Sequence, residues 1–420
     1  MFKQYIKQAF LMLKENRLTS TVSILGTALS IAMILVVVLQ FQIRLVGFRP
    51  ESNRDRMLYI MGIRADSRDG KSLNSTAMSD GVVKECLYPL QTPEAVTAMA
   101  NSQAIVYLPD RQLFEEYQIK YTDSGFWKIF DFRFLSGKPF TEADFESGLP
   151  RVVMANRLAR KLFGSEPPVG KVVLIGSVPH TVTGVVEDPS RVADCTYADL
   201  WAPYTSYAGY TNSRSCGGVS GSFQGVILAR SKKDFEAIRA EVGQAVSRYN
   251  AAGREFVLGI NSVFSRLDLA LGSTDMDGGI RVGWMEYWIN KAPLLLFLLL
   301  VPTLNLTGVV QSSVQKRRSE MGLRKAFEAT KGRLLAQVLF ENLITTLIGG
   351  GIGIVLSVVL LQVGKSFLLT KDTLVTFEML FKPGLFVAAL LFTLLLNLLS
   401  AGLPAFRIAR EQIVEALNSK

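Results

Sequence analysis

Residues 18–43 read LTSTVSILGTALSIAMILVVVLQFQI, a run of 26 residues without Asp, Glu, Lys or Arg. A helix rising 1.5 Å per residue needs about 20 residues to cross about 30 Å of hydrocarbon, so this run is long enough to span a membrane. A helix in a soluble core rarely lacks charge on every face over such a length. The run has no small-residue cleavage pattern at its end, and we expect it to remain as a membrane anchor rather than to be removed as a signal peptide.

Three further runs have the same character. They cover 24, 23 and 24 residues without charge, at 292–315, 342–364 and 383–406. The sequence therefore predicts an α-helical membrane domain with four spans, at 20–46, 286–314, 334–364 and 383–406. The long segment between the first two spans, 47–285, is predicted to be a large extracytoplasmic domain.

The positive charge is unevenly distributed. Residues 1–20, 312–333 and the segment after Leu403 hold nine of the chain's net ten positive charges. Because Lys and Arg concentrate in cytoplasmic loops, both termini and the 312–333 segment are predicted to be cytoplasmic. The same charge lies beside the spans and lacks an aromatic platform or a groove-reading motif, so nucleic-acid binding is not expected.

This topology assigns the remaining segments. We expect a cytoplasmic amphipathic helix over 1–19, because Phe2, Ile6, Phe10 and Leu13 recur at helical spacing. The other segments are a cytoplasmic loop at 315–333, an outer loop at 365–382 and a cytoplasmic tail at 407–420.

Strand-like and helix-like stretches alternate in the outer domain, which predicts an α+β fold. Two lobes are expected: one built from both ends of the segment and a second inserted at about 105–220. Residues 92–101 are predicted to be a helix because Pro93 suits a first turn. Strands are predicted at 57–63, 151–154, 171–175 and 180–186, and a β-α-β unit at 223–229, 232–249 and 255–260.

The residue types needed for catalysis are sparse. The nearest approaches to a P-loop, at 65–72 and 164–172, lack a required glycine or the Ser/Thr that holds magnesium, so we expect no cofactor in this chain. His180 is the single histidine, and an ordinary, partly exposed side chain is predicted for it; metal ligation and enzymatic activity are not expected. Cys195 and Cys216 are compatible with a disulfide in an oxidising periplasm and equally with free thiols.

One cytoplasmic stretch carries a recognisable pattern. Residues 315–343 read QKRRSEMGLRKAFEATKGRLLAQVLFENL and join the second span to the third. This segment resembles the loop of MacB/FtsX-family permeases, in which a Glu-(Ile/Met)-Gly-(Ile/Leu)-Arg-Lys-Ala motif precedes the third span. The matching residues are Glu320, Met321, Gly322, Leu323, Arg324, Lys325 and Ala326. Phe327 and Glu328 depart from the family pattern, which usually has Gly shortly after the motif.

The outer domain carries the same resemblance. Residues 151–175 read RVVMANRLARKLFGSEPPVGKVVLI and are followed by VTGVVED at 182–188. These elements, with FWKIFDFRFLSGKPF at 126–140 and PAFRIAR at 404–410, resemble MacB-like permeases over nearly the whole chain. Gln412 and Ile413 stand where Asn-Pro is common in the family.

The resemblance implies a permease subunit of an ABC transporter. It implies that ATP and Mg²⁺ are bound by a separate ABC ATP-binding subunit, that the permease forms a homodimer or a heterodimer, and that a periplasmic adaptor and an outer-membrane channel are potential partners. The cargo of such systems is a macrolide, a peptide or a similar amphipathic molecule. Two alternatives share the topology: an FtsX-like regulator of a cell-wall hydrolase, whose outer domain is usually smaller, and lipoprotein release in the manner of LolC or LolE.

The physical character of the loop agrees with a coupling role. A short basic helix between two spans can bind a groove of a cytoplasmic ATPase through complementary charge. Lys316, Arg317 and Arg318 are also suited to contact anionic membrane lipid. We therefore expect residues 320–326 to couple to the ATPase and the preceding basic residues to contact lipid.

Overall fold

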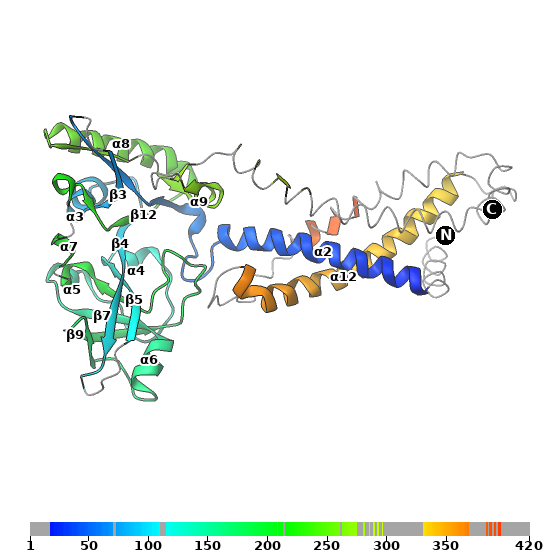
Figure 1. The fold of residues 1–420 in the computed structure, drawn as a ribbon, viewed down its shortest axis with the longest axis horizontal. Helices are drawn as coiled ribbons and strands as arrows, with labels where there is room; N and C mark the ends of the chain where they lie inside the picture. Colours follow the sequence, from blue (N-terminus) through cyan, green and yellow to red (C-terminus); the bar gives the residue numbers. More distant parts are fainter. Residues whose placement is uncertain are drawn as a thin grey trace. The chain divides into compact units, whose positions relative to one another are not determined.

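The computed structural model describes residues 17–69, 73–109, 115–207, 209–212, 215–260, 263–274, 280–281 and 331–368, with isolated positions in 285–296 and 384–395. The described residues form two compact units (Figure 1). One contains helix α2 up to Ile43 together with α12. The other begins at Arg44 and contains the strands of the outer domain, up to Tyr287.

Two helices of the first unit are long and apolar enough to cross a membrane. Helix α2 covers Arg17–Leu45 and α12 covers Lys331–Leu368. The parts that satisfy length and composition are Ser20–Leu45 and Leu343–Gly364. These segments correspond to the first and third predicted spans.

The packing of α12 is typical of a membrane helix. Its buried face carries small or hydroxyl side chains at helical spacing, including Thr346, Gly349, Gly353 and Ser357. Its exposed face carries large apolar side chains: Leu347, Ile352, Val355, Val359, Leu360 and Val363. Small residues inside and large apolar residues outside are the arrangement expected when lipid, rather than water, surrounds a helix.

Several predicted segments lie outside the described residues. They include 1–16 of the amphipathic helix, most of the spans at 286–314 and 383–406, most of the loops at 315–333 and 365–382, and the tail at 407–420. The four-span count and the segment boundaries therefore stay predictions.

The second unit is organised around a ten-stranded sheet. The strand order is β14-β1-β12-β4-β5-β10-β7-β9-β6, and β8 pairs with both β4 and β9. Most pairs are antiparallel, but β5 with β10 and β7 with β9 are parallel. The strands are β1 (Met57–Ile60), β4 (Ala95–Tyr107), β5 (Glu115–Thr122), β6 (Phe134–Gly137), β7 (Arg151–Ala155), β8 (Val172–Ile175), β9 (Val178–Val186), β10 (Leu200–Pro203), β12 (Gln224–Leu228) and β14 (Phe264–Ser265).

Both faces of this sheet are buried. In β1, Leu58 and Ile60 belong to one hydrophobic cluster, whereas Met57 and Tyr59 belong to another. Successive strand residues point to opposite faces, so a strand covered on both sides reads as continuously apolar. The same alternation is present in β7, which was predicted as a strand, and in β10, which was not.

Helices cover the sheet on both faces. Helices α6 and α8 contribute to the first cluster, and α4 contributes to the second. In Figure 1, α6 lies beside β7 and β9, and α8 lies near the small sheet that contains β3. The helices and short turns are α3 (Asp80–Val82), η2 (Val83–Leu87), α4 (Phe126–Ile129), α5 (Glu142–Glu146), α6 (Asn156–Phe163), α7 (Gly209–Asn212), α8 (Phe235–Ala251), α9 (Arg266–Leu271), η1 (Arg54–Arg56), η3 (Tyr204–Ser206), η4 (Cys216–Gly218) and η5 (Lys232–Asp234).

Two smaller sheets complete the unit. One has the order β11-β3-β2-β13 and the other pairs β15 with β16. Their strands are β2 (Ile63–Ser67), β3 (Leu73–Met78), β11 (Ser220–Gly221), β13 (Phe256–Gly259), β15 (Ser273–Thr274) and β16 (Ile280–Arg281).

Most predicted strands of the outer domain are confirmed, and so is the helix at 232–249. The predicted helix at 92–101 is wrong: most of this stretch belongs to β4, which pairs with β12 on one side and β5 on the other. The predicted β-α-β unit is also wrong, because β12 and β13 belong to different sheets.

The two-lobe layout is not confirmed. Strands from 57–60, 224–228 and 264–265 join strands from 95–203 in one continuous sheet, and the segment from Arg44 to Tyr287 forms one compact unit. An insertion near 105–220 is not separated from the rest, because β4 crosses the expected boundary and pairs on both sides of it.

Candidate functional site

The predicted coupling residues lie outside the described part of the chain. They are Glu320, Met321, Gly322, Leu323, Arg324, Lys325 and Ala326. Helix α12 begins at Lys331, shortly after them. Their assignment therefore stays a prediction.

The motif residues of the outer domain have structural roles. Gly164 ends α6 with a φ of +61°, a conformation that a side chain disfavours, and its amide donates to the carbonyl of Arg160 at 2.9 Å. The Gly170 amide donates to the carbonyl of Val182 at 2.8 Å. The pattern at 161–171 thus builds a helix end and a turn before β8.

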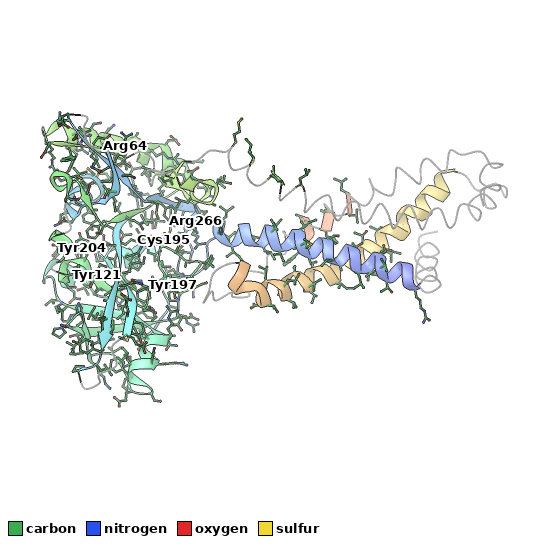
Figure 2. All side chains as sticks on the ribbon, viewed as in Figure 1. Arg64, Tyr121, Cys195, Tyr197, Tyr204 and Arg266 are labelled. Atoms are coloured by element: carbon green, nitrogen blue, oxygen red, sulfur yellow. The ribbon has the colours of Figure 1, made fainter. Side chains whose placement is uncertain are left out.

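A largely buried cluster of charged and polar side chains lies beside the last residues of α2. It consists of Glu51, Arg54, Asp194, Thr196 and Arg266, and we call it the Arg54–Arg266 cluster. Its members come from the segment after α2, the loop between β9 and β10, and the first residue of α9. Figure 2 labels Arg266 and the neighbouring Cys195 in this region.

Arg54 is fully enclosed. Its side chain is 0% exposed, and its Nε donates to Glu51 Oε2 at 2.6 Å. The two terminal nitrogens donate to the carbonyls of Val46 at 3.3 Å and Val192 at 2.8 Å. The guanidinium also lies 4.3 Å from the centre of the Phe48 ring. The planar guanidinium group of arginine has several N–H donors and can make these contacts at the same time, whereas the single ammonium group of lysine cannot.

Glu51 is equally buried and fully used as an acceptor. While Oε2 binds Arg54, Oε1 accepts the Thr196 amide and lies 3.1 Å from both the amide nitrogen and the hydroxyl of Thr196. The carboxylate therefore joins the segment after α2 to the loop between β9 and β10. Removing one partner of a buried ion pair is strongly destabilising, because the other charge is left without compensation.

Arg266 reaches the last turn of α2. Its Nε donates to the carbonyl of Arg44 at 2.6 Å, and one terminal nitrogen lies 3.1 Å from Asp194 Oδ1. The last four carbonyls of a helix lack partners within the helix, and the helix dipole favours positive charge there. Arg266 is 8% exposed, so this bond is largely shielded from water.

The electrostatics of the cluster favour a charged Arg266 and neutral Cys195 and Tyr59 side chains. Burial acts to lower the pKa of Arg266, but the carboxylates of Asp194 and Glu51 outweigh it, and the pKa is raised. Burial raises the pKa of the Cys195 thiol well above its ordinary value, and the nearby carboxylates add to the effect. Burial likewise raises the pKa of Tyr59. Neither group is therefore expected to ionise near pH 7.

A metal ion does not suit this cluster. Glu51, Asp194 and Cys195 place one potential ligand atom each within 4.8 Å of one another. However, the carboxylates already accept from arginine, and a thiol with a raised pKa is a poor ligand because the thiolate binds metals. Arg54, Arg266 and the buried Lys120 also oppose a cation.

The remaining candidate residues are structural. Cys195 and Cys216 are free thiols and form no disulfide with each other. His180 is 3% exposed, so the expectation of a partly exposed side chain is wrong. It lies on β9, and its Nδ1 is 2.9 Å from the carbonyl oxygen of Val178.

Sequence reasoning did not find the Arg54–Arg266 cluster. Its arginines contact acceptors up to 222 residues away in the chain. The spacing of apolar residues along the sequence does not predict contacts over such a separation. One signal was available: Ser265-Arg266-Leu267-Asp268 is a capping box, in which Ser265 and Asp268 cap each other's backbone. It marks the start of α9 and thus the place of Arg266.

Two protein families match this architecture. The MacB-like periplasmic core domain matches residues 20–245, more than half of the chain, and the FtsX-like permease C-terminal domain matches residues 294–413. The chain belongs to the MacB/FtsX family of ABC transporter permeases. The second match covers the predicted coupling loop and the membrane segments on either side of it.

Individual MacB/FtsX relatives are distant. The uncharacterized ABC transporter permease YknZ of Bacillus subtilis is 23% identical, over 70% of this chain and 68% of its own length. The macrolide export ATP-binding/permease protein MacB of Hahella chejuensis is 26% identical, over 99% of this chain. The chain spans 60% of the length of that protein, whose name includes an ATP-binding part.

Solved structures of the family resemble the outer domain only loosely. The extracellular domain of YknZ from Gram-positive bacteria is 18% identical and covers 47% of this chain and 98% of that chain, with a TM-score of 0.34. The periplasmic region of MacB from Actinobacillus actinomycetemcomitans is 15% identical and covers 49% of this chain and 89% of that chain, also with a TM-score of 0.34.

Proposed function

We propose that this MacB/FtsX-family chain is a permease subunit that couples ATP hydrolysis by a separate ABC ATP-binding subunit to a conformational change of its outer domain. Its proposed location is a bacterial inner membrane, with both termini cytoplasmic. The family match over both the outer domain and the membrane domain carries this proposal. Residues 1–420 contain no P-loop motif, so the nucleotide would bind outside this segment.

The proposed output is export. Relatives that match nearly the whole chain are named macrolide export proteins, which supports an amphipathic cargo such as a macrolide or a peptide. A permease dimer, a periplasmic adaptor and an outer-membrane channel are the proposed partners. An FtsX-like regulator of a cell-wall hydrolase and LolC/LolE-like lipoprotein release remain the alternatives, and the native complex distinguishes them: it would contain a channel, a hydrolase or a lipoprotein chaperone.

The coupling loop gives the sharpest test of this proposal. Changing Glu320→Lys together with Arg324→Glu reverses two charges on the predicted ATPase-facing motif but leaves the loop basic. Disrupting a desolvated charged pair costs about 2 to 5 kcal/mol, or roughly 30-fold or more in affinity, whereas a charge near lipid contributes about 1 kcal/mol. We expect the double variant to insert into the membrane normally and to lose co-purification of the ATPase, cargo resistance of the cells, or both.

The matched control neutralises Lys316, Arg317 and Arg318 to glutamine. If these residues contact lipid, the control keeps the ATPase and most of the cargo resistance. The reverse pattern, with the double variant near wild type and the control inactive, would show that the motif does not couple and that the basic residues carry the function of the loop.

A further inference from the structure

We propose that the Arg54–Arg266 cluster is the element that carries displacement of α2 into the outer sheet, with Arg54 and Arg266 as positioning residues for coupling. This inference rests on the proposed function, because it assigns a route within an ATP-driven permease. It concerns residues that lie far from the predicted ATPase loop in the sequence and that no motif of the resemblance includes.

The first step of the argument is the attachment to α2. The carbonyl of Arg44, in the last turn of α2, accepts a hydrogen bond from Arg266 at 2.6 Å. The carbonyl of Val46, the residue that follows the helix, accepts one from Arg54 at 3.3 Å. Both donors are charged, and charge-assisted hydrogen bonds are stronger than neutral ones. They bind backbone atoms, so movement of the helix end moves their acceptors directly.

The second step is the attachment to the sheet. Arg54 begins η1, which leads directly into β1 at Met57. Arg266 follows Ser265, whose backbone pairs with Leu58 of the same strand. Both arginines are therefore anchored beside β1, although 212 positions separate them in the sequence. Since β1 belongs to the ten-stranded sheet, a shift at this strand acts on a hydrogen-bonded framework rather than on a loop.

The third step is the connection of both arginines to the loop between β9 and β10. Glu51 joins Arg54 to Thr196, and Asp194 contacts Arg266, so both arginines also connect to the loop before β10. A buried ion pair is not a particularly efficient source of stability, because apolar side chains of similar volume often serve as well. Its distinctive property is that it requires one geometry, which is what a mechanical connection needs.

Arg239 provides a matched control. Its Nε donates to the carbonyl of Val263 at 3.1 Å, and another nitrogen lies 3.4 Å from Asp268. A third nitrogen lies 2.6 Å from Glu236, so Arg239, like Arg266, combines one backbone carbonyl with carboxylate partners, but its hydrogen bonds and ion pairs do not reach α2. Arg239→Lys and Arg266→Lys both retain a positive charge and lose the planar guanidinium with its several N–H donors. A difference in coupling between the two variants therefore reports the contact with the end of α2.

The experiment uses the full chain assembled with its ATPase in lipid nanodiscs. Spin labels at Leu347 on α12 and at Lys128 on α4, both exposed, report the distance between the two units with and without ATP. Transport per ATP hydrolysed is measured on the unlabelled complexes in sealed proteoliposomes, with a radiolabelled macrolide as the probe. Arg266→Lys is expected to reduce the ATP-dependent distance change and the transport ratio by roughly 5-fold or more, while the ATPase still binds and hydrolyses ATP. Arg239→Lys is expected to leave both unchanged.

The outcomes separate the two proposals. A normal distance change and transport ratio in Arg266→Lys, equal to those of Arg239→Lys, would overturn the role of the cluster while leaving the permease function intact. No ATP-dependent change in the unsubstituted complex would overturn the proposed function and, with it, this inference. If Arg266→Lys does not assemble, Asp194→Ala replaces it. Asp194 is 61% exposed, and its loss removes the ion pairs with Arg266 at 3.1 Å and with Arg54 at 4.0 Å; an unchanged transport ratio in that variant would overturn the inference.

Discussion

At the scale of single residues, the buried polar groups of the outer unit differ in how completely they are satisfied. Asp123 accepts from Thr97 at 2.6 Å, from the Ala98 amide at 2.8 Å and from Tyr88 at 2.6 Å. By contrast, Nε2 of the buried His180 has no hydrogen-bond partner among the described residues. A buried polar atom without a partner is costly, and a positive charge there is more so.

His180 should therefore make stability depend on pH. Burial lowers its pKa below the ordinary value, against the opposing effect of the hydrogen bond with Val178. Because the unfolded chain binds a proton more readily than the folded chain, stability should fall as the pH drops below about 6.5, by about 1 kcal/mol per pH unit until the folded-state pKa is passed. Thermal unfolding of the purified chain between pH 7.5 and 5.5 measures this.

The control for this prediction is His180→Gln, which cannot titrate. We expect the variant to show a smaller loss of stability with acidification than the wild type. Equal pH dependence in the two proteins would mean that carboxylates such as Asp123, whose pKa is raised by burial, and not His180, determine how the stability of the outer unit depends on pH.

At the scale of elements, the contact between α2 and α12 depends on two glycines of α12. A Cβ atom added to Gly353 would lie 2.8 Å from the carbonyl oxygen of Ala28 and 2.9 Å from Ile31 Cβ. One added to Gly349 would lie 2.9 Å from Thr27 Cβ. Close backbone approach at residues spaced four apart is the usual way in which membrane helices gain packing energy.

Gly353→Ala should destabilise this helix pair, and Gly351→Ala provides the control. A Cβ at Gly351 would meet nothing within 4 Å, so both variants gain the same helix propensity but only one creates a clash. We expect Gly353→Ala to be less stable than Gly351→Ala by about 1 to 3 kcal/mol in detergent unfolding experiments. Equal stabilities would show that the helices separate slightly without cost.

The elements also show what the sequence can and cannot predict. Strands β7, β8 and β9 were predictable because their apolar runs are short and bounded by turn residues, as at Gly164 and Gly170. The stretch 92–101 was predicted as a helix from Pro93, yet the pairing of β4 with two neighbours overrides that local signal. The Arg54–Arg266 cluster was not predictable, because only the long-range fold brings Arg266 to the end of α2.

At the scale of the whole molecule, the charge distribution predicts which segments lie on each side of the membrane. Single cysteines at Ser165 and Lys371, in a cysteine-free background, should react with an impermeant thiol reagent in intact spheroplasts, because both positions are predicted to lie outside. A cysteine at Ser319, within the basic loop, should react only after the membrane is opened. Labelling of Ser319 without labelling of Ser165 would invert the topology.

The continuity of the large sheet has a consequence for how the outer unit is made. Strand β1 pairs with β12 and β14, and its partners in β12 lie about 170 residues further along the chain. The chain crosses the membrane from its N-terminal side, so β1 emerges before both of its partner strands. Until they follow, both edges of β1 are unpaired, and unpaired strand edges are templates for incorrect association between chains. Folding of this unit is thus delayed until Ser265 has been translocated, and we expect the interval before that moment to be when nascent chains most need protection from one another.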